Sequence, residues 1–182
     1  MCLDVLHEML SRARLAGTGG RLVRVCGTIH CLRPSPAFDL VTAIDDVAAY
    51  VGAQPGGLEG FLAELRERLR PGGVFLFDFI TPAGRQRYTF RNSRQIGAAR
   101  ITADSRGRFD EHGRVLCVEL TLTGPDHVAR ERHLLRLYTA EEMEALLWRA
   151  GFEVLAITDL YDGAGVGYRA GEPSYDVLAC RL

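Results

Sequence analysis

A nearly unbroken apolar run, VFLFDF at residues 74–79, constrains the fold more than any other feature of the sequence. A strand with one face in water alternates polar and apolar residues, whereas a strand covered on both faces stays apolar, as in parallel sheets. The run follows Pro71-Gly72-Gly73, which ends a helical pattern of apolar residues over 61–69. Helix, turn and buried strand together predict an α/β fold with parallel strands.

The alternation of strand and helix patterns extends along the chain. Residues 5–13 have a helical pattern, and residues 21–26 and 38–44 are predicted to form short strands. From 114 to 122 the apolar residues Leu116, Val118, Leu120 and Leu122 share one face and Glu119 and Thr121 lie on the other, which is typical of an antiparallel strand with one face in water. Residues 127–138 are expected to pair with it. The sequence therefore predicts an antiparallel insertion over about residues 96–138.

A capping box opens the last predicted helix, because Thr139 is followed three residues later by Glu142. Apolar residues at helical spacing continue to Ala150, and Gly151 provides the C-terminal cap. Two final strands are predicted near 153–160 and 175–182. The sequence has no repeat and no linker, so residues 1–182 are predicted to form one domain.

Composition argues against several classes of function. A formal net charge of −1 and a pI near 6.5 argue against nucleic acid or an anionic membrane as an obligatory partner, since both require a basic surface. All 22 basic residues are Arg, so no lysine is present to form a Schiff base or to hold phosphates in a P-loop. No apolar run approaches the roughly 18 residues of a membrane span, and no signal peptide pattern opens the sequence.

The five cysteines are scattered without the spacing of a disulfide framework. They indicate reduced thiols in a cytoplasmic protein. Cys26, His30 and Cys31 lie close together, but no fourth ligand is nearby. Since structural metal sites usually need four ligands, we expect no metal site.

Five short segments occur in a fixed order along the chain. They are DVLHEML at 4–10, FDLVTA at 38–43, LRPGGVF at 69–75, HLLRLYT at 133–139, and LL at 146–147 with AGF at 150–152. Each is similar to the segment at the same place in class I S-adenosylmethionine-dependent methyltransferases that act on small molecules. The resemblance spans almost the whole sequence. It implies a Rossmann-like sheet, with the antiparallel insertion as a roof over the substrate pocket.

The resemblance begins inside the family's second strand, because Met1 falls within the segment that is similar to it. It implies that the family's first strand and the glycine-rich loop after it are absent, so that the domain is N-terminally truncated. In the family that strand lies between the segments at 1–4 and 38–44, and we therefore expect a gap within the sheet. The gap can close in two ways. The strands on either side of it pair directly, or a second protein chain, in a homodimer or a complex with a different protein, supplies the missing strand. We favour the second chain.

The resemblance implies S-adenosylmethionine as the cofactor, with contacts from Asp4, Thr28 and Ile29. Asp4 stands where the family has an acid that binds the ribose hydroxyls, although an Asp before a helix is also a good N-cap. Gly27-Thr28 stands where the family has Gly-Asp, next to the adenine. A chain that binds no cofactor is the alternative.

Three carboxylates lie where predicted strands end. Asp45 and Asp46 follow the strand at 38–44, and Asp78 ends the strand at 74–79. The carboxyl ends of parallel strands meet at the ligand-binding edge of an open α/β sheet. Adjacent carboxylates that are desolvated together raise the pKa of one, which makes it a usable base. We therefore predict Asp45 and Asp46 as catalytic and Asp78 as substrate-binding; a solvated helix start is the alternative.

His133 lies among arginines in the predicted insertion. An imidazole there can accept a substrate proton, and a guanidinium can hold a carboxylate, phosphate or sulfate in bidentate geometry. The alternative is a strand face in water with ordinary charges. We predict His133 as a third catalytic residue and assign substrate contacts to Tyr88, Arg136 and Tyr138.

These features predict a methyltransferase-fold subunit of a small-molecule tailoring enzyme, in natural-product (specialised) metabolism. Methyl transfer is an in-line displacement that needs positioning and a base. A partner chain is expected to complete the site, so methyl transfer by this chain alone is not expected. Two alternatives are a repurposed fold that catalyses leaving-group elimination or ring closure without S-adenosylmethionine, and a non-catalytic subunit that stabilises an active partner.

Overall fold

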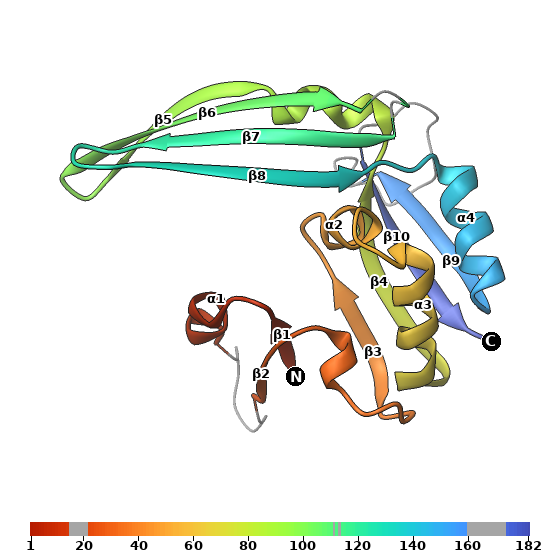
Figure 1. Cartoon of the computed structure of the whole chain (residues 1–182). Helices are drawn as coiled ribbons and strands as arrows, with labels where there is room; N and C mark the ends of the chain where they lie inside the picture. The colour runs from red at the N-terminus through yellow and green to blue at the C-terminus, as the bar shows by residue number, and fades with distance from the viewer. Residues whose placement is uncertain (15–21, 111, 113, 160–173) are drawn as a thin grey trace.

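A four-stranded sheet forms the centre of the computed structural model, which describes residues 1–14, 22–110, 112, 114–159 and 174–182 (Figure 1). Its strand order is β3-β4-β10-β9. The strands are β3 (Phe38–Ala43), β4 (Leu69–Ile80), β9 (Phe152–Asp159) and β10 (Ser174–Arg181). β3 is parallel to β4, whereas β10 is antiparallel to both β4 and β9. The predicted α/β fold with a parallel strand pair is confirmed.

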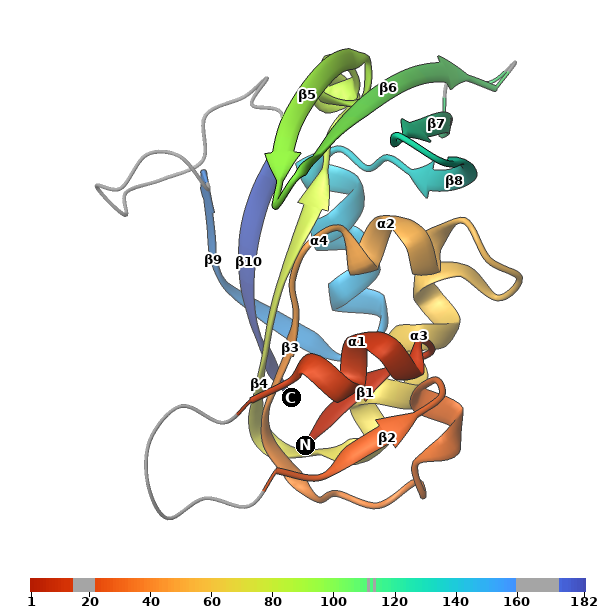
Figure 2. The ribbon, with the colours of Figure 1, turned by 90° about the vertical axis from the view of Figure 1, so that its left-hand side faces the viewer.

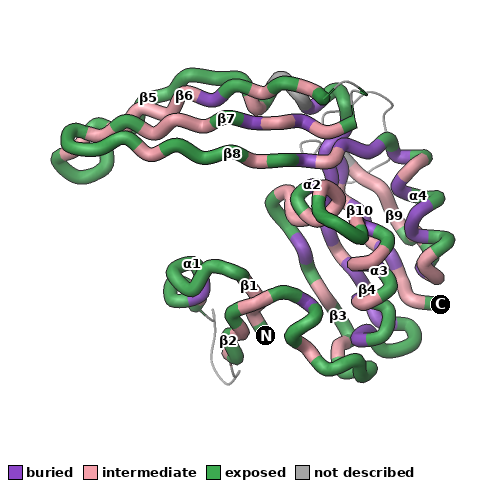
Figure 3. The backbone as a smooth tube through the Cα atoms, viewed as in Figure 1, coloured by how far each residue is buried: buried purple, intermediate pink, exposed green. Residues whose placement is uncertain are grey.

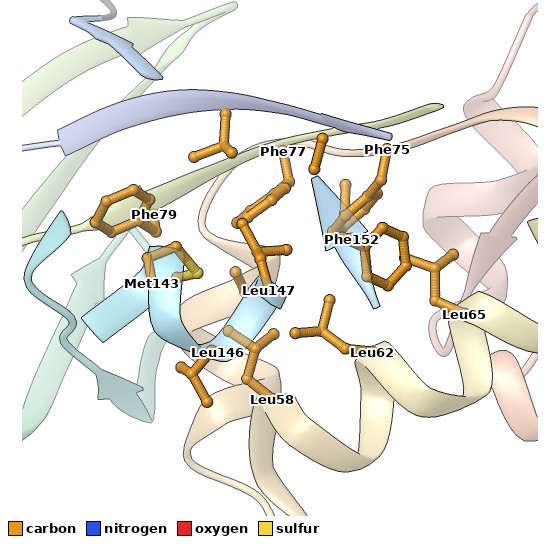
Figure 4. Close-up of a cluster of buried hydrophobic side chains, with 14 of the residues drawn as sticks. Leu58, Leu62, Leu65, Phe75, Phe77, Phe79, Met143, Leu146, Leu147 and Phe152 are labelled. Carbon is orange, nitrogen blue, oxygen red and sulfur yellow. The ribbon is translucent and has the colours of Figure 1, made fainter. Parts of the chain in front are cut away.

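Two amphipathic helices, α3 (Gly57–Arg68) and α4 (Ala140–Arg149), cover one face of this sheet (Figures 1 and 4). Phe75, Phe77 and Phe79 alternate along β4 and point toward them, each fully buried. The apolar stripes predicted for both helices pack against these rings. On the opposite face Val74 and Leu76 are only half-buried, so in the described part of the chain β4 is less covered there than its sequence predicts.

The predicted capping box opens α4. Thr139 Oγ1 accepts a hydrogen bond from Glu142 N at 3.2 Å, and Glu142 Oε2 accepts one from Thr139 N at 3.0 Å. α3 ends at Arg68, one residue earlier than its apolar pattern predicts. Leu69 instead begins β4, because this strand pairs with β3 from its first residue.

A second sheet of four antiparallel strands, which we call the roof sheet, extends away from the central sheet (Figure 1). It consists of β5 (Phe90–Ile96), β6 (Ala99–Phe109), β7 (Val115–Thr123) and β8 (Val128–Arg136), and the short 3-10 helix η2 (Pro82–Tyr88) leads into it. The predicted insertion is therefore confirmed, but it begins at residue 90 rather than 96. All seven residues of β5 are exposed, so this strand has no apolar face that a sequence pattern could indicate (Figure 3).

A short helix, α2 (Val47–Gly52), lies between β3 and the roof sheet. Ala49 of this helix packs in a buried cluster with Ile80 at the end of β4 and with Leu135 of β8. These contacts hold the roof sheet against the carboxyl ends of the central strands, where the candidate site lies.

The N-terminal segment forms a small sheet of its own, in which β1 (Cys2–Asp4) pairs parallel with β2 (Arg24–Cys26). It lies beside β3 in two perpendicular views (Figures 1 and 2). Leu3 packs against the main core. Among the described residues β1 and β3 share no hydrogen-bonded ladder, so each has one edge without a strand partner there.

Two short helices belong to this region, α1 (His7–Arg12) and the 3-10 helix η1 (Ile29–Cys31). The helical pattern over 5–13 predicts a buried apolar face, but Val5, Leu6 and Met9 are exposed and Leu10 alone is buried in α1. The expected burial of this face is therefore not observed in the described structure.

Replacement of Leu147 by Ala tests the core between α4 and β4. Leu147 is 0% exposed, so Leu147→Ala should lower the free energy of unfolding by about 2–5 kcal/mol through lost burial and a cavity. The adjacent Trp148 is 70% exposed, and Trp148→Ala should change it by no more than about 0.5 kcal/mol. Urea denaturation of both variants measures the difference, and equal effects would contradict the assigned packing of α4.

Candidate active site

The chain leaves β3 through two consecutive residues in the left-handed backbone region. Asp45 has a φ of +73° and Asp46 a φ of +67°. For residues other than glycine this conformation costs about 1–2 kcal/mol each and persists only where neighbouring groups hold it. Such strain is concentrated at functional sites, and here it lies at the carboxyl end of a parallel strand.

The carboxylate of Asp78 holds this strained turn. Asp46 N donates a hydrogen bond to Asp78, with its nitrogen 3.1 Å from Oδ2 and 3.3 Å from Oδ1. Asp78 is only 5% exposed, which is rare for a carboxylate and requires such partners. From η2, Tyr88 Oη donates a short hydrogen bond to Asp46 Oδ2. Four of the sequence-predicted residues, Asp45, Asp46, Asp78 and Tyr88, therefore lie together.

Burial raises the pKa of Asp46, and the negative charges of Asp78 and Asp45 raise it further, against the lowering effect of the Tyr88 hydrogen bond. Burial likewise raises the pKa of Asp78, although backbone N–H groups that donate to it act in the opposite direction. The pKa of Tyr88 is raised by burial and by its bond to Asp46, so the phenol stays protonated as a donor. Asp46 thus has the environment of a general base.

His133 of β8 is joined to the same region through α2. Its Nδ1 lies 3.0 Å from the phenol oxygen of Tyr50, which follows Asp46 by one helical turn. Its Nε2 lies 3.2 Å from Glu131 Oε2. Burial and the charge of Asp46 raise the pKa of Tyr50. The structure therefore adds Tyr50 and Glu131, which the sequence analysis missed.

One sequence signal could have identified Tyr50. It follows Asp46 by four residues, a spacing that places two side chains on the same face of a helix. No comparable pattern indicates the contact between Tyr50 and His133, because 83 residues separate them in the sequence.

Arg136 and Tyr138 lie elsewhere, around a separate cavity of about 320 Å³ between α3, α4 and the end of β8. The guanidinium of Arg136 lies 5.5 Å from the centre of the Tyr138 ring. Gly52 allows this packing, since a Cβ there would come within 2.3 Å of Tyr138 Oη. The residues that line this cavity include neither Asp46 nor His133. Substrate contacts by Arg136 and Tyr138 stay a prediction.

The residues assigned to a cofactor lie at the carboxyl ends of β1 and β2. Gly27 N donates to the carbonyl oxygen of Asp4 at 2.8 Å, which brings the two strand ends together. Asp4 Oδ1 accepts from Leu6 N at 2.8 Å, so its side chain holds the chain before α1 without capping that helix directly. Thr28 is exposed beside it, whereas Ile29 is buried in the main core.

The donor set at this edge is compatible with part of a nucleoside. An Asp at a strand end is suited to ribose hydroxyls, and Asp4 keeps a second carboxylate oxygen beyond the one bonded to Leu6. In the described ranges, no group of three or more His, Cys, Asp or Glu is placed to hold a metal ion. Nor does any helix in those ranges have the length and apolar character to cross a membrane.

No known family model matches the sequence, and no curated protein matches it. Solved methyltransferase structures do match the fold. An S-adenosylmethionine-dependent methyltransferase from Clostridium acetobutylicum has a TM-score of 0.77 at 21% identity, over 98% of this chain and 73% of that one. A sugar N-methyltransferase from Streptoalloteichus has 0.70 at 20% identity, over 98% of this chain and 69% of that one.

An amino pentose methyltransferase from Micromonospora echinaspora, involved in calicheamicin biosynthesis and solved with S-adenosylmethionine bound, has a TM-score of 0.66 at 23% identity. The match covers 99% of this chain and 72% of that one. These proteins support the resemblance seen in the sequence at the level of the fold. The chain has the fold of the class I S-adenosylmethionine-dependent methyltransferases.

Proposed function

We propose that this chain is the catalytic subunit of a small-molecule methyltransferase that transfers a methyl group to an amino sugar. The observation that carries the proposal is the acid cluster at the carboxyl edge of β3 and β4, in which Asp78 is buried, Asp46 is half-buried and Asp45 is exposed. Three carboxylates in one place favour a cationic substrate group such as an ammonium. The sugar N-methyltransferase and amino pentose methyltransferase among the similar structures support this class of substrate.

The acid cluster performs two steps. It attracts the substrate ammonium, and Asp46 then accepts one proton from it, because an amine attacks only through a free lone pair. The raised pKa of Asp46 favours this transfer, while Tyr88 donates to the Asp46 carboxylate and Asp78 accepts from the Asp46 backbone amide, which together hold the residue in place. When bound, S-adenosylmethionine supplies the electrophilic methyl group. On this chain Asp4 and Thr28 would hold its ribose and adenine end.

A second protein chain completes the site by adding a strand between β1 and β3. In the described structure β1 and β3 each have one edge that pairs with no other strand. Leu40 and Ile44, on and just after β3, are exposed, as are Val5, Leu6 and Met9 near β1. Strand addition would pair these edges and cover apolar surface at the same time. We favour a different protein over a second copy as the donor of that strand.

Replacement of Asp46 by Asn tests the proposed base. In the assembled enzyme with an amino-sugar acceptor, Asp46→Asn should lower kcat by about 10²–10⁴-fold, because an amide cannot accept the proton. Because the pKa of Asp46 is raised, the wild-type rate should also fall on acidification at a higher pH than the pKa of an ordinary carboxylate would give. Asp39→Asn is the matched control, since Asp39 lies on β3 but is exposed and paired with Arg70. Wild-type rates in both Asp45→Asn and Asp46→Asn would instead support a non-catalytic subunit.

Asp78→Asn should stabilise the protein near neutral pH. A carboxyl whose pKa is raised on folding binds protons more tightly in the folded state, so its stabilising effect is present in acid and lost as the pH rises through the raised pKa. Asn removes the ionised form yet keeps an oxygen that accepts from Asp46 N. The urea midpoint should therefore rise near pH 7, and the gain should shrink in acid. A lower midpoint at both pH values would contradict the assigned environment of Asp78.

The isolated chain should bind S-adenosylmethionine no tighter than about 0.1 mM, or about −5.5 kcal/mol, because the residues that we assign to the cofactor would contact only its nucleoside end. Native mass spectrometry should show a complex or a dimer rather than the 20.1 kDa monomer. Calorimetry on that assembly should show tighter cofactor binding than on the chain alone. A cooperatively folded monomer that binds the cofactor at micromolar concentration would contradict the need for a partner.

A further inference from the structure

A hydrogen-bonded triad of side chains, Tyr50, His133 and Glu131, joins α2 to the roof sheet. The two bonds run from the Tyr50 phenol to His133 Nδ1, at 3.0 Å, and from His133 Nε2 to Glu131 Oε2, at 3.2 Å. The rings of Tyr50 and His133 also meet edge to face, with centroids 5.8 Å apart. Glu131 and His133 are two residues apart on β8, so both side chains leave the same face of that strand.

The donors and acceptors in this triad determine one another. An ionised carboxylate only accepts, so Glu131 takes the hydrogen on His133 Nε2. A neutral imidazole has a single N–H, so Nδ1 is an acceptor and the hydrogen bond to it comes from the Tyr50 hydroxyl. Both ring nitrogens of His133 are then occupied. The Tyr50 oxygen keeps its lone pairs, and the residue is 38% exposed.

Tyr50 is also held beside the acid cluster. It follows Asp46 by four residues on α2, and Asp46 N–H is itself fixed by the carboxylate of Asp78. Burial and the charges of Asp46 and Asp45 raise the pKa of Tyr50, which keeps the phenol protonated and its hydrogen directed to His133. A ligand at the acid cluster therefore meets an acceptor oxygen whose hydrogen points away from it.

We propose that Tyr50 contacts the substrate and orients its nucleophile by accepting a hydrogen bond from it, with His133 and Glu131 as positioning residues behind the phenol. This inference rests on the proposed methyl transfer and deepens it. One N–H of the substrate amine is directed to Tyr50, and another is directed to Asp46, which takes the proton. The lone pair that results has one orientation, as an in-line displacement requires. His133 then acts through Tyr50 rather than on the substrate.

The protonation state of His133 tests the triad without any activity assay. Long-range ¹H–¹⁵N spectra of the full-length, ¹⁵N-labelled chain should show the Nε2–H form of His133, assigned by the signals that His133→Gln removes. Glu131→Gln should lose the preference for that form, since a neutral amide no longer selects it. Glu119→Gln is the matched control, because Glu119 is exposed on the neighbouring strand β7 and pairs in register with Arg132, on the face of the sheet opposite to Glu131 and His133. It should leave the His133 signals unchanged.

Kinetics on the assembled enzyme with an amino-sugar acceptor test the role of Tyr50. Tyr50→Phe should lower kcat/KM by about 10- to 100-fold, as expected for the loss of a hydrogen bond to a charged group. Glu131→Gln should lower it less, and Glu119→Gln should leave it unchanged. Circular dichroism on each variant checks that the fold is kept.

Two results would overturn the inference: His133 with its hydrogen on Nδ1, or Tyr50→Phe at the wild-type rate. A wild-type assembly that transfers no methyl group would contradict the proposed function instead. In that case the spectra of His133 still decide whether the triad exists. The two failures are therefore distinguishable.

Discussion

The hydrogen bonds between the amide of Asp46 and the buried carboxylate of Asp78 are the interaction on which the site depends. Two left-handed residues after β3 are unfavourable by themselves, and α2 has no side-chain cap to begin it. The Asp78 carboxylate satisfies the amide at that point and so fixes where α2 starts. The position of every later residue of α2, including Tyr50, follows from it. A carboxylate is kept buried here at a cost to stability, as is common where function requires it.

Local patterns were sufficient to predict most of the fold. The apolar run of β4, the stripes of α3 and α4 and the capping box at Thr139 each depend on neighbours within one element, and the structure has all of them. β5 could not be predicted, since none of its side chains is buried and no periodicity remains. The pattern at 5–13 fails for the opposite reason. Its apolar residues are periodic, but most have no described surface to pack against.

The site divides in the same way. The sequence could place Asp45, Asp46 and Asp78 together, because the rule that parallel strands share a carboxyl edge needs only the strand assignments. It could not find Tyr50 or Glu131, since their contact with His133 depends on how the roof sheet packs on α2. Arg136 and His133 are close in sequence, but three positions along a strand place them on opposite faces. Their separation into two different regions of the fold follows from that alternation.

The acid cluster and the residues that we propose bind the cofactor depend on different parts of the chain. The acid cluster and Tyr88 are held by β3 and β4 of the central sheet and by η2, which leads from β4 into the roof sheet. Asp4 and Thr28 belong to the small β1–β2 sheet, which the described structure joins to the core through side-chain packing such as that of Leu3 and not through a ladder. A strand added between β1 and β3 would fix the distance between the two halves. Because such a strand and the cofactor would both favour that arrangement, each should strengthen binding of the other.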